Sequence, residues 1–168
     1  MTITTDLTRL PEPTNITDVT TREYLNELIR VLTSNIANFE QSLDTFGRTF
    51  TRIVTGAFDG GGVVIESASE ASVRVPFSGI ISTASIICDQ VGSLEVDIWK
   101  APFQDYPNSI GDSITGGNNL VITSDDQLLN NTLTGWNLTV NSGDVITFRV
   151  VSCSAITNAI IGLEIIPI

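Results

Sequence analysis

The sequence predicts a mainly β protein in which an N-terminal α-helical coiled-coil stalk precedes an antiparallel β-sheet head. Three observations lead to this fold class. Apolar residues recur every three or four positions up to residue 53, and with a period of two after residue 62. The run FDGGG at 58–62 separates the two regions. A hydrophobic content of 42% with 16% charged residues is typical of a folded or assembling chain rather than a disordered one.

The charge composition also limits the classes of partner that we expect for this protein. Eight Lys and Arg residues against nineteen Asp and Glu residues give a net charge of -11 at pH 7. A surface of this charge repels phosphate groups, so we expect neither nucleic acids nor anionic membranes as partners. The opening MTITTDLTRLPEPTN has no basic segment followed by an apolar run. We therefore expect no signal peptide, no membrane span, and a protein made or assembled in the cytosol.

Residues 1–19 are predicted to form an extended N-terminal anchor. Their prolines hold the backbone extended, and their threonine-rich composition cannot build a core alone. Such an arm can become ordered on a partner, with apolar side chains in separate pockets. The predicted anchor residues are Leu7, Leu10, Pro11, Pro13 and Ile16. The alternative is an untethered, disordered terminus.

Residues 20–55 are predicted to form the coiled-coil stalk, because their apolar residues alternate spacings of four and three without a break. This 3.5-residue period is the signature of a seam between helices. The predicted seam residues are Leu25, Ile29, Leu32, Ile36, Phe39, Leu43, Phe46, Phe50 and Ile53. The alternative is one amphipathic helix packed on its own domain.

A few residues indicate where the stalk helix begins and ends and how many helices the coiled coil contains. Thr20 and Glu23 form a capping-box pattern that places the helix start near residue 20. Gly47 weakens the last turns, so the helix is expected to fray or end early there. Isoleucine and leucine in the first layers favour a dimer, whereas three phenylalanines need a wider core. The seam by itself leaves dimer and trimer open.

Residues 56–62 are predicted to be a glycine-rich joint, and residues 63–168 the head. The glycines would let the chain turn from the helix axis into the first strand. The head contains short runs with β-branched residues and period two, separated by turn signals, as in antiparallel sandwiches and barrels. These runs are VVIES, SVRVPFSG, GIISTASIICD, SLEVDIW, WNLTV, DVITFRVVS and AIIGLEIIPI.

Two blocks of the head, GSLEVDIWKAP and LTGWNLTVNSGDVITFRVVS, carry a family resemblance. With the loop PNSIGDSIT between them and the closing strand AIIGLEIIPI, they are similar to a β-sandwich module at the C-terminal ends of tailed-phage fibre and virion-surface proteins. The most characteristic residues are Gly92, Asp97, Ile98, Trp99 and Lys100, then Gly135, Trp136, Gly143, Asp144, Val145 and Phe148. The resemblance covers about residues 63–168 and implies a jelly-roll-like head, a homotrimer about the stalk, and a non-enzymatic role on the virion. The N-terminal part lies outside it.

No catalytic or cofactor site is expected. The chain has no histidine, which removes the usual general base and histidine-ligated zinc. Asp105, Asp112, Asp125 and Asp126 lie in a polar stretch, where turn residues exposed to solvent are the simplest reading. They have neither a matched acid and base nor the spacing of a calcium loop. We predict no enzyme activity, no cofactor and no metal.

Four further side chains have predicted roles. Trp99 lies opposite the apolar face of its strand, so it is a candidate head interface, covered by a neighbouring subunit or exposed for a ligand. Trp136 shares a face with apolar residues and is assigned to the core. Cys88 and Cys153 lie in apolar runs and are predicted to be buried thiols rather than a disulfide or a metal site.

Together these expectations describe a short homotrimeric phage fibre, located on the virion and assembled in the host cytoplasm. The N-terminus would bind a capsid or tail protein, and the head would attach to a glycan or protein of the host surface. One alternative is a capsid decoration (cement) protein that stabilises the shell. A further alternative is a trimeric binding protein similar to C1q or tumour necrosis factor, although such proteins are secreted.

Overall fold

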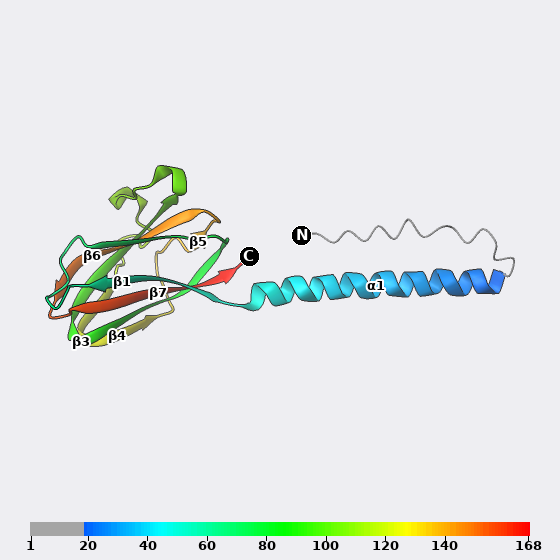
Figure 1. Ribbon diagram of the computed structural model, residues 1–168, viewed down its shortest axis with the longest axis horizontal. Helices are drawn as coiled ribbons and strands as arrows, with labels where there is room; N and C mark the ends of the chain where they lie inside the picture. Colours follow the sequence, from blue (N-terminus) through cyan, green and yellow to red (C-terminus); the bar gives the residue numbers. More distant parts are fainter. Residues whose placement is uncertain (1–18) are drawn as a thin grey trace. The chain divides into compact units, whose positions relative to one another are not determined.

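The computed structural model describes residues 19–168, apart from the side chains of residues 19–20 and 44–49. The chain divides into two compact units, Met1–Phe46 and Gly47–Ile168. The described part of the first unit is helical, and the second unit holds the described strands (Figure 1). The protein is therefore mainly β with one N-terminal helix, which confirms the coarse prediction.

Helix α1, Val19–Thr49, follows the predicted apolar repeat and begins one residue before the predicted start. On its polar side, the Arg30 guanidinium donates hydrogen bonds of 2.9 and 2.7 Å to the Glu27 carboxylate. The Thr33 hydroxyl donates to the Ile29 carbonyl oxygen at 2.8 Å. Exposed contacts of this kind stabilise a helix only slightly.

Strand β1, Arg52–Asp59, corrects the predicted stalk and joint. Residues 51–55 contain four β-branched residues, which favour a strand. Val54, Gly56 and Phe58 point inward with period two, and the strand pairs with the end of the chain. The predicted stalk, 20–55, was therefore too long, and the predicted joint, 56–62, begins inside a strand.

The three glycines form a turn inside the β unit. The Gly61 backbone N–H donates to Asp59 Oδ1 at 2.7 Å, and the Gly60 N–H donates to the Thr157 carbonyl oxygen at 2.8 Å. Gly61 and Gly62 have φ angles of +66° and +87°, which glycine adopts without steric cost. FDGGG thus ends β1 and is not a joint between stalk and head, as the sequence had indicated.

One antiparallel sheet of seven strands makes up the β unit. After β1 come β2 Glu70–Arg74, β3 Gly79–Pro102, β4 Leu120–Asn130, β5 Thr139–Val140, β6 Asp144–Ser154 and β7 Asn158–Pro167. Their order is β1-β7-β3-β6-β2, with β4 and β5 also paired to β3. Short 3-10 turns, Phe103–Asp105 and Ile110–Asp112, lie between β3 and β4.

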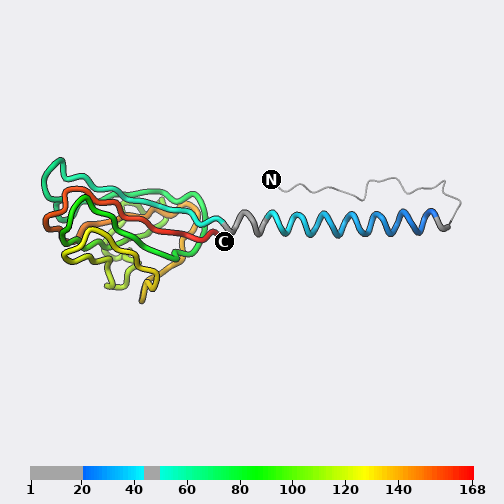
Figure 2. The backbone as a smooth tube through the Cα atoms, turned by 90° about the horizontal axis from the view of Figure 1, so that it is seen from below, coloured from blue at the N-terminus to red at the C-terminus, as the bar shows by residue number. Residues whose placement is uncertain are grey.

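Strand β3 joins the two halves of this sheet. Its first half pairs with β7, from Gly79 to Cys88, and its second half pairs with β6, from Ser93 to Pro102. Register shifts between Ile87 and Ser93, in its pairing with β4, mark irregularities of the kind that bend a strand. Because β1 also lies beside β2, the sheet curves nearly into a barrel around one core (Figures 1 and 2).

The predicted strands differ from the observed ones at four places. The run at 63–67 forms no strand, and two predicted strands are continuous in β3. β4 was not predicted, and it contains Asp125 and Asp126, which had been assigned to a loop. β1 had been divided between the predicted stalk and the predicted joint. The head therefore begins before residue 63.

The core confirms one assignment and modifies another. Trp136 is 8% exposed, and its indole N–H donates to the Asn118 carbonyl oxygen at 2.8 Å. Cys88 and Cys153 are free thiols, but both are half-buried rather than fully buried. Across the interior, a Cβ on Gly56 would lie 2.4 Å from Cδ2 of Phe148, so β1 approaches β6 too closely for any other residue.

Candidate functional site

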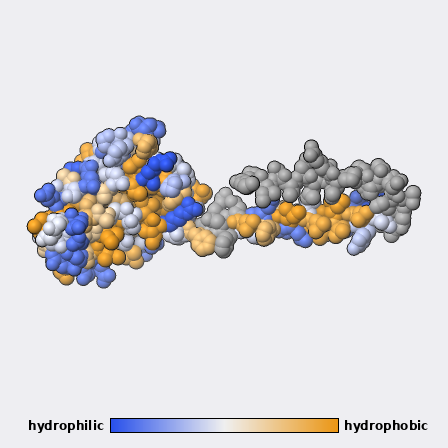
Figure 3. Space-filling view, in the orientation of Figure 1, coloured by the Kyte–Doolittle hydropathy of each residue, from blue (hydrophilic) through white to orange (hydrophobic). Residues whose placement is uncertain are grey.

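The apolar side of α1 is exposed along its described length. Leu25 is half-buried, and the next five seam residues are 37–64% exposed. These are Ile29, Leu32, Ile36, Phe39 and Leu43. Figure 3 shows apolar surface along the visible side of the helix. No side chain described between residues 21 and 43 is buried, so the stripe has no partner within this part of the chain.

Large apolar side chains make up this stripe, and few charges flank it. Burying one leucine, isoleucine or phenylalanine contributes roughly 1.5–3 kcal/mol. The flanking e positions hold Asn26, Thr33 and Glu40, and the flanking g positions hold Leu28, Asn35 and Ser42. Glu40 is the one charged residue among them, so any association of this helix through the stripe would depend on the apolar seam.

The last predicted seam residues are not part of this described surface. The side chain of Phe46 lies outside the described residues. Phe50 follows the end of α1, and Ile53 lies on the outward face of β1, so the prediction that both belong to the helical seam was wrong. Their spacing continued the heptad, but so short an apolar run cannot be assigned to helix or strand by periodicity alone.

Trp99 is covered within its own chain, which corrects its prediction as a head interface covered by a neighbouring subunit or exposed for a ligand. It is 5% exposed, and its indole N–H donates to Asp97 Oδ2 at 2.6 Å. The Arg149 guanidinium lies over the indole ring, 4.9 Å from the ring centroid. Ser113 forms an isolated β-bridge with Trp99, so the loop between β3 and β4 covers this face of the sheet.

The Asp97 carboxylate on β3 holds the loop between β3 and β4 in place by hydrogen bonds. It is 8% exposed, and its Oδ1 accepts hydrogen bonds of 2.8 Å from the hydroxyls of Ser113 and Thr115. Thr115 also bonds to Asn119, whose amide donates to Glu95 Oε1 at 2.7 Å. The sequence shows each of these polar residues but not their convergence. Their role here is structural, because every polar group named has a partner inside the chain.

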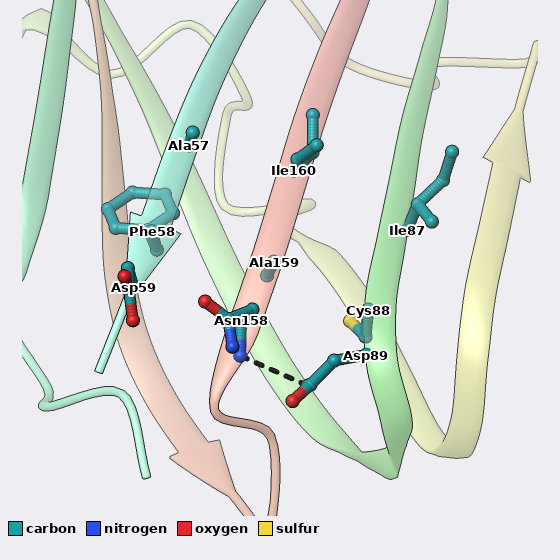
Figure 4. A pocket seen from close by; sticks show the side chains of 9 residues that line it. All are labelled: Ala57, Phe58, Asp59, Ile87, Cys88, Asp89, Asn158, Ala159 and Ile160. Carbon is teal, nitrogen blue, oxygen red and sulfur yellow. Dashed lines mark hydrogen bonds between the residues drawn. The ribbon is translucent and has the colours of Figure 1, made fainter. Parts of the chain in front are cut away.

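A shallow groove of about 420 Å³ lies where β1, β7 and β3 run side by side (Figure 4). Its lining residues are Ala57, Phe58, Asp59, Ile87, Cys88, Asp89, Asn158, Ala159 and Ile160. Figure 4 shows Ala57, Ile160 and Ile87 on the three neighbouring strands, and Asp89 at one end. The groove was missed from sequence because residues 57–59 of β1 had been assigned to the glycine-rich joint.

Asp89 and Cys88 in this groove have shifted pKa values that keep the carboxylate ionised and the thiol protonated at neutral pH. Asp89 accepts bonds from the Thr157 hydroxyl and from the backbone N–H groups of Asn158 and Thr157. These bonds, the hydroxyl first, lower the pKa of Asp89 to about 2. Burial raises the pKa of the Cys88 thiol to about 11, so it is protonated at neutral pH. The groove therefore presents apolar surface, a thiol and an ionised carboxylate already held by hydrogen bonds.

Among the side chains that the structure describes, no three His, Cys, Asp or Glu residues gather closely enough to hold a metal ion. None of the helices described there has the length and hydrophobicity of a membrane span. The predicted anchor residues lie outside the described part of the chain. They are Leu7, Leu10, Pro11, Pro13 and Ile16.

Comparisons with known proteins show only distant likenesses. No family model and no curated protein matches the chain. Among solved structures, 70% of the chain is similar to 26% of the catalytic domain of Agl-KA, at 13% identity and a TM-score of 0.32. The same share is similar to 30% of a chain of infectious bursal disease virus, Gx strain, at 13% identity and a TM-score of 0.29.

A third likeness is to RmlC from Streptococcus suis in complex with dTDP-D-xylose. It covers 70% of this chain and 45% of that chain, at 10% identity and a TM-score of 0.21. The chain spans less than half of each of these three structures. At such TM-scores the likenesses indicate no shared function.

Proposed function

We propose that this chain is a non-enzymatic structural subunit of a tailed-bacteriophage virion. In this proposal three chains form a short fibre through α1, the N-terminus attaches to a capsid or tail protein, and a jelly-roll-like β head attaches to a glycan or protein of the host surface. The observation that carries the proposal is the exposed apolar seam from Leu25 to Leu43, followed directly by a β unit. A helix with such a seam is stabilised by association with other helices.

Two further features support a fibre. Association through α1 brings several β units together at one end, so weak binding by each head becomes strong binding by the assembly. The acidic surface, with a net charge of -11, suits display in solvent and disfavours binding to nucleic acid. The choice of three chains rests on the resemblance of the head to phage fibre modules and on the large Phe39 layer of the seam.

The oligomeric state of the full chain tests the seam. Light scattering should give a mass of about 54 kDa, three times 18.0 kDa. Phe39→Asp should yield monomers or aggregates, because it places a charge in an apolar layer. Asn38→Asp is the matched control, because it adds the same charge at an exposed position outside the seam. A monomeric full chain at micromolar concentration would exclude the fibre, and a dimer would exclude the trimer.

Incorporation into particles tests the role on the virion. A chain lacking residues 2–17 should remain a folded trimer with unchanged thermal unfolding but should be missing from purified particles. Undeleted chain in the same cells is the control and should copurify with the particles. Incorporation of the deleted chain would contradict the N-terminal anchor and favour a decoration protein that docks through its β unit.

A further inference from the structure

The two outward sides of the β unit differ in what covers them. On the side of β6 and the second half of β3, the loop after β3 covers Asp97 and Trp99, which are 8% and 5% exposed. On the side of β1, β7 and the first half of β3, no described segment of the β unit covers the outward residues. We call this side the bare face and define it by Ile53, Ala57, Leu129, Ile87, Ile160 and Gly162.

The register makes these residues one continuous surface. Ile160 pairs with Ala57 on β1 and with Ile87 on β3, so the three form a row across neighbouring strands. In the next row Gly162 pairs with Thr55 and Ser85. This second row has small side chains at its centre, and the Cβ that Gly162 lacks would lie 2.9 Å from Ser85 Oγ, so the Ser85 side chain packs closely beside Gly162. The exposed isoleucines lie in the rows on either side of this closely packed row.

The isoleucines and the leucine of the bare face are more than half exposed to solvent. Ile53, Ile87, Leu129 and Ile160 are 65%, 61%, 69% and 51% exposed. Asp59 and Asp89 stand at one end of the bare face, and at the other end Glu164 pairs with Ile53. The row of Ala57, Ile160 and Ile87 between these carboxylates is apolar throughout, and an apolar patch with a charged rim marks an interaction surface.

The chain itself indicates which partner meets this surface. Only residues 50 and 51 separate the end of α1 from β1, and so short a link spans roughly 10 Å at most. In the proposed helical trimer, the first residues of the three β1 strands are therefore tethered close to one another, which gives the β units a high effective concentration. β1 forms one border of the bare face. Because each chain carries a net charge of -11, neighbouring β units repel one another except where their contact surfaces lack charge.

We propose that the bare face packs against the β unit of a neighbouring copy of this chain. The inference rests on the proposed trimer and adds a second interface to it, between heads rather than between helices. Ile87 and Ile160 form the centre of this interface, and the acidic ends stay at its rim in solvent. The heads then act as one rigid group, which presents the loop side of each β unit outward.

Photo-crosslinking of the full chain tests the contact directly. Benzoylphenylalanine replaces Ile160 in one variant and Val121 in the control, which is 50% exposed and pairs with Glu95 on the loop side. Irradiation should produce chain-to-chain products from position 160 and only background from position 121. Equal products from both positions, or none from position 160 in a chain that light scattering shows to be trimeric, would overturn the inference and leave the trimer standing.

Charge substitution provides a second measurement. Ile87→Glu with Ile160→Glu should raise the concentration at which half of the trimer dissociates by about tenfold or more, equivalent to about 1.4 kcal/mol. Val121→Glu with Val151→Glu is the matched control and should leave that concentration unchanged. Far-UV circular dichroism verifies that both variants are folded. An unchanged midpoint in the bare-face variant would overturn the inference, whereas a full chain that is monomeric from the start overturns the proposed fibre as well.

Discussion

The buried carboxylate of Asp97 allows the attachment of the loop between β3 and β4 to be measured. Asp97→Ala removes the acceptor of the Trp99 indole, at 2.6 Å, and of two hydroxyls at 2.8 Å. Among the described residues the indole N–H has no other bonded acceptor, whereas Ser113 and Thr115 contact each other at 3.1 Å and can exchange partners. Leaving the indole unpaired costs about 2 kcal/mol, and weakening the two hydroxyl bonds adds roughly 1–2 kcal/mol.

We therefore expect Asp97→Ala to lower the free energy of unfolding of the β unit by about 3–4 kcal/mol. Urea unfolding followed by far-UV circular dichroism measures this change. Asp105→Ala is the matched control, because Asp105 is exposed and close in sequence to the same loop, and it should change the free energy by less than about 0.5 kcal/mol.

A double-mutant cycle separates the hydrogen bond from general damage. Trp99→Phe removes the indole donor, so the loss caused by Asp97→Ala should be smaller by about 1–2 kcal/mol in the Trp99→Phe background. If the effects of Asp97→Ala and Trp99→Phe on the free energy of unfolding were strictly additive, the 2.6 Å hydrogen bond between the Trp99 indole and Asp97 would not be the main contribution of the carboxylate. A cost of Asp97→Ala no greater than that of Asp105→Ala would refute the role of the carboxylate altogether.

Three further predictions concern the β unit. Gly56→Ala should lower the free energy of unfolding by about 1–3 kcal/mol in urea unfolding, because the new Cβ would lie 2.4 Å from Phe148. Gly111→Ala is the control and should be nearly neutral, because its new Cβ would lie 3.6 Å from Ser109 Oγ. Equal effects of the two substitutions would contradict the close approach of β1 to Phe148. The low pKa of Asp89, about 2, means that its carboxylate stabilises the folded state fully above about pH 4 and loses this effect as the pH falls towards 2. The stability difference between wild type and Asp89→Asn should therefore shrink over that range, and a constant difference would argue against it. With its pKa raised to about 11, the Cys88 thiol should react with a disulfide reagent at pH 8 roughly a hundredfold more slowly than in urea-unfolded chain, and equal rates would show an accessible thiolate.

Much of the architecture was predictable because it depends on local periodicity. The spacing from Leu25 to Leu43 predicted the exposed apolar side of α1, and alternation within β6 and β7 predicted those strands. Where two periods fit the same residues, prediction failed. Phe50 and Ile53 continue the heptad, yet the pairing of Arg52–Asp59 with β7 gives this segment its conformation. A distant strand at the end of the chain supplies those hydrogen bonds, so the local pattern could not reveal them.

By itself, the sequence determined the acidic character of the protein, its helical N-terminal repeat, its β-rich remainder and the core position of Trp136. Only the tertiary structure decided which outward faces are covered. Trp99 and Ile160 both occupy outward positions on strands, but Trp99 is 5% exposed and Ile160 is 51% exposed. The difference arises because a loop held by the Asp97 carboxylate crosses one face, while no described segment of the β unit crosses the other. Alternation along a strand determines to which face of the sheet a side chain points. Whether another segment covers that side chain depends on the packing of segments far apart in the sequence.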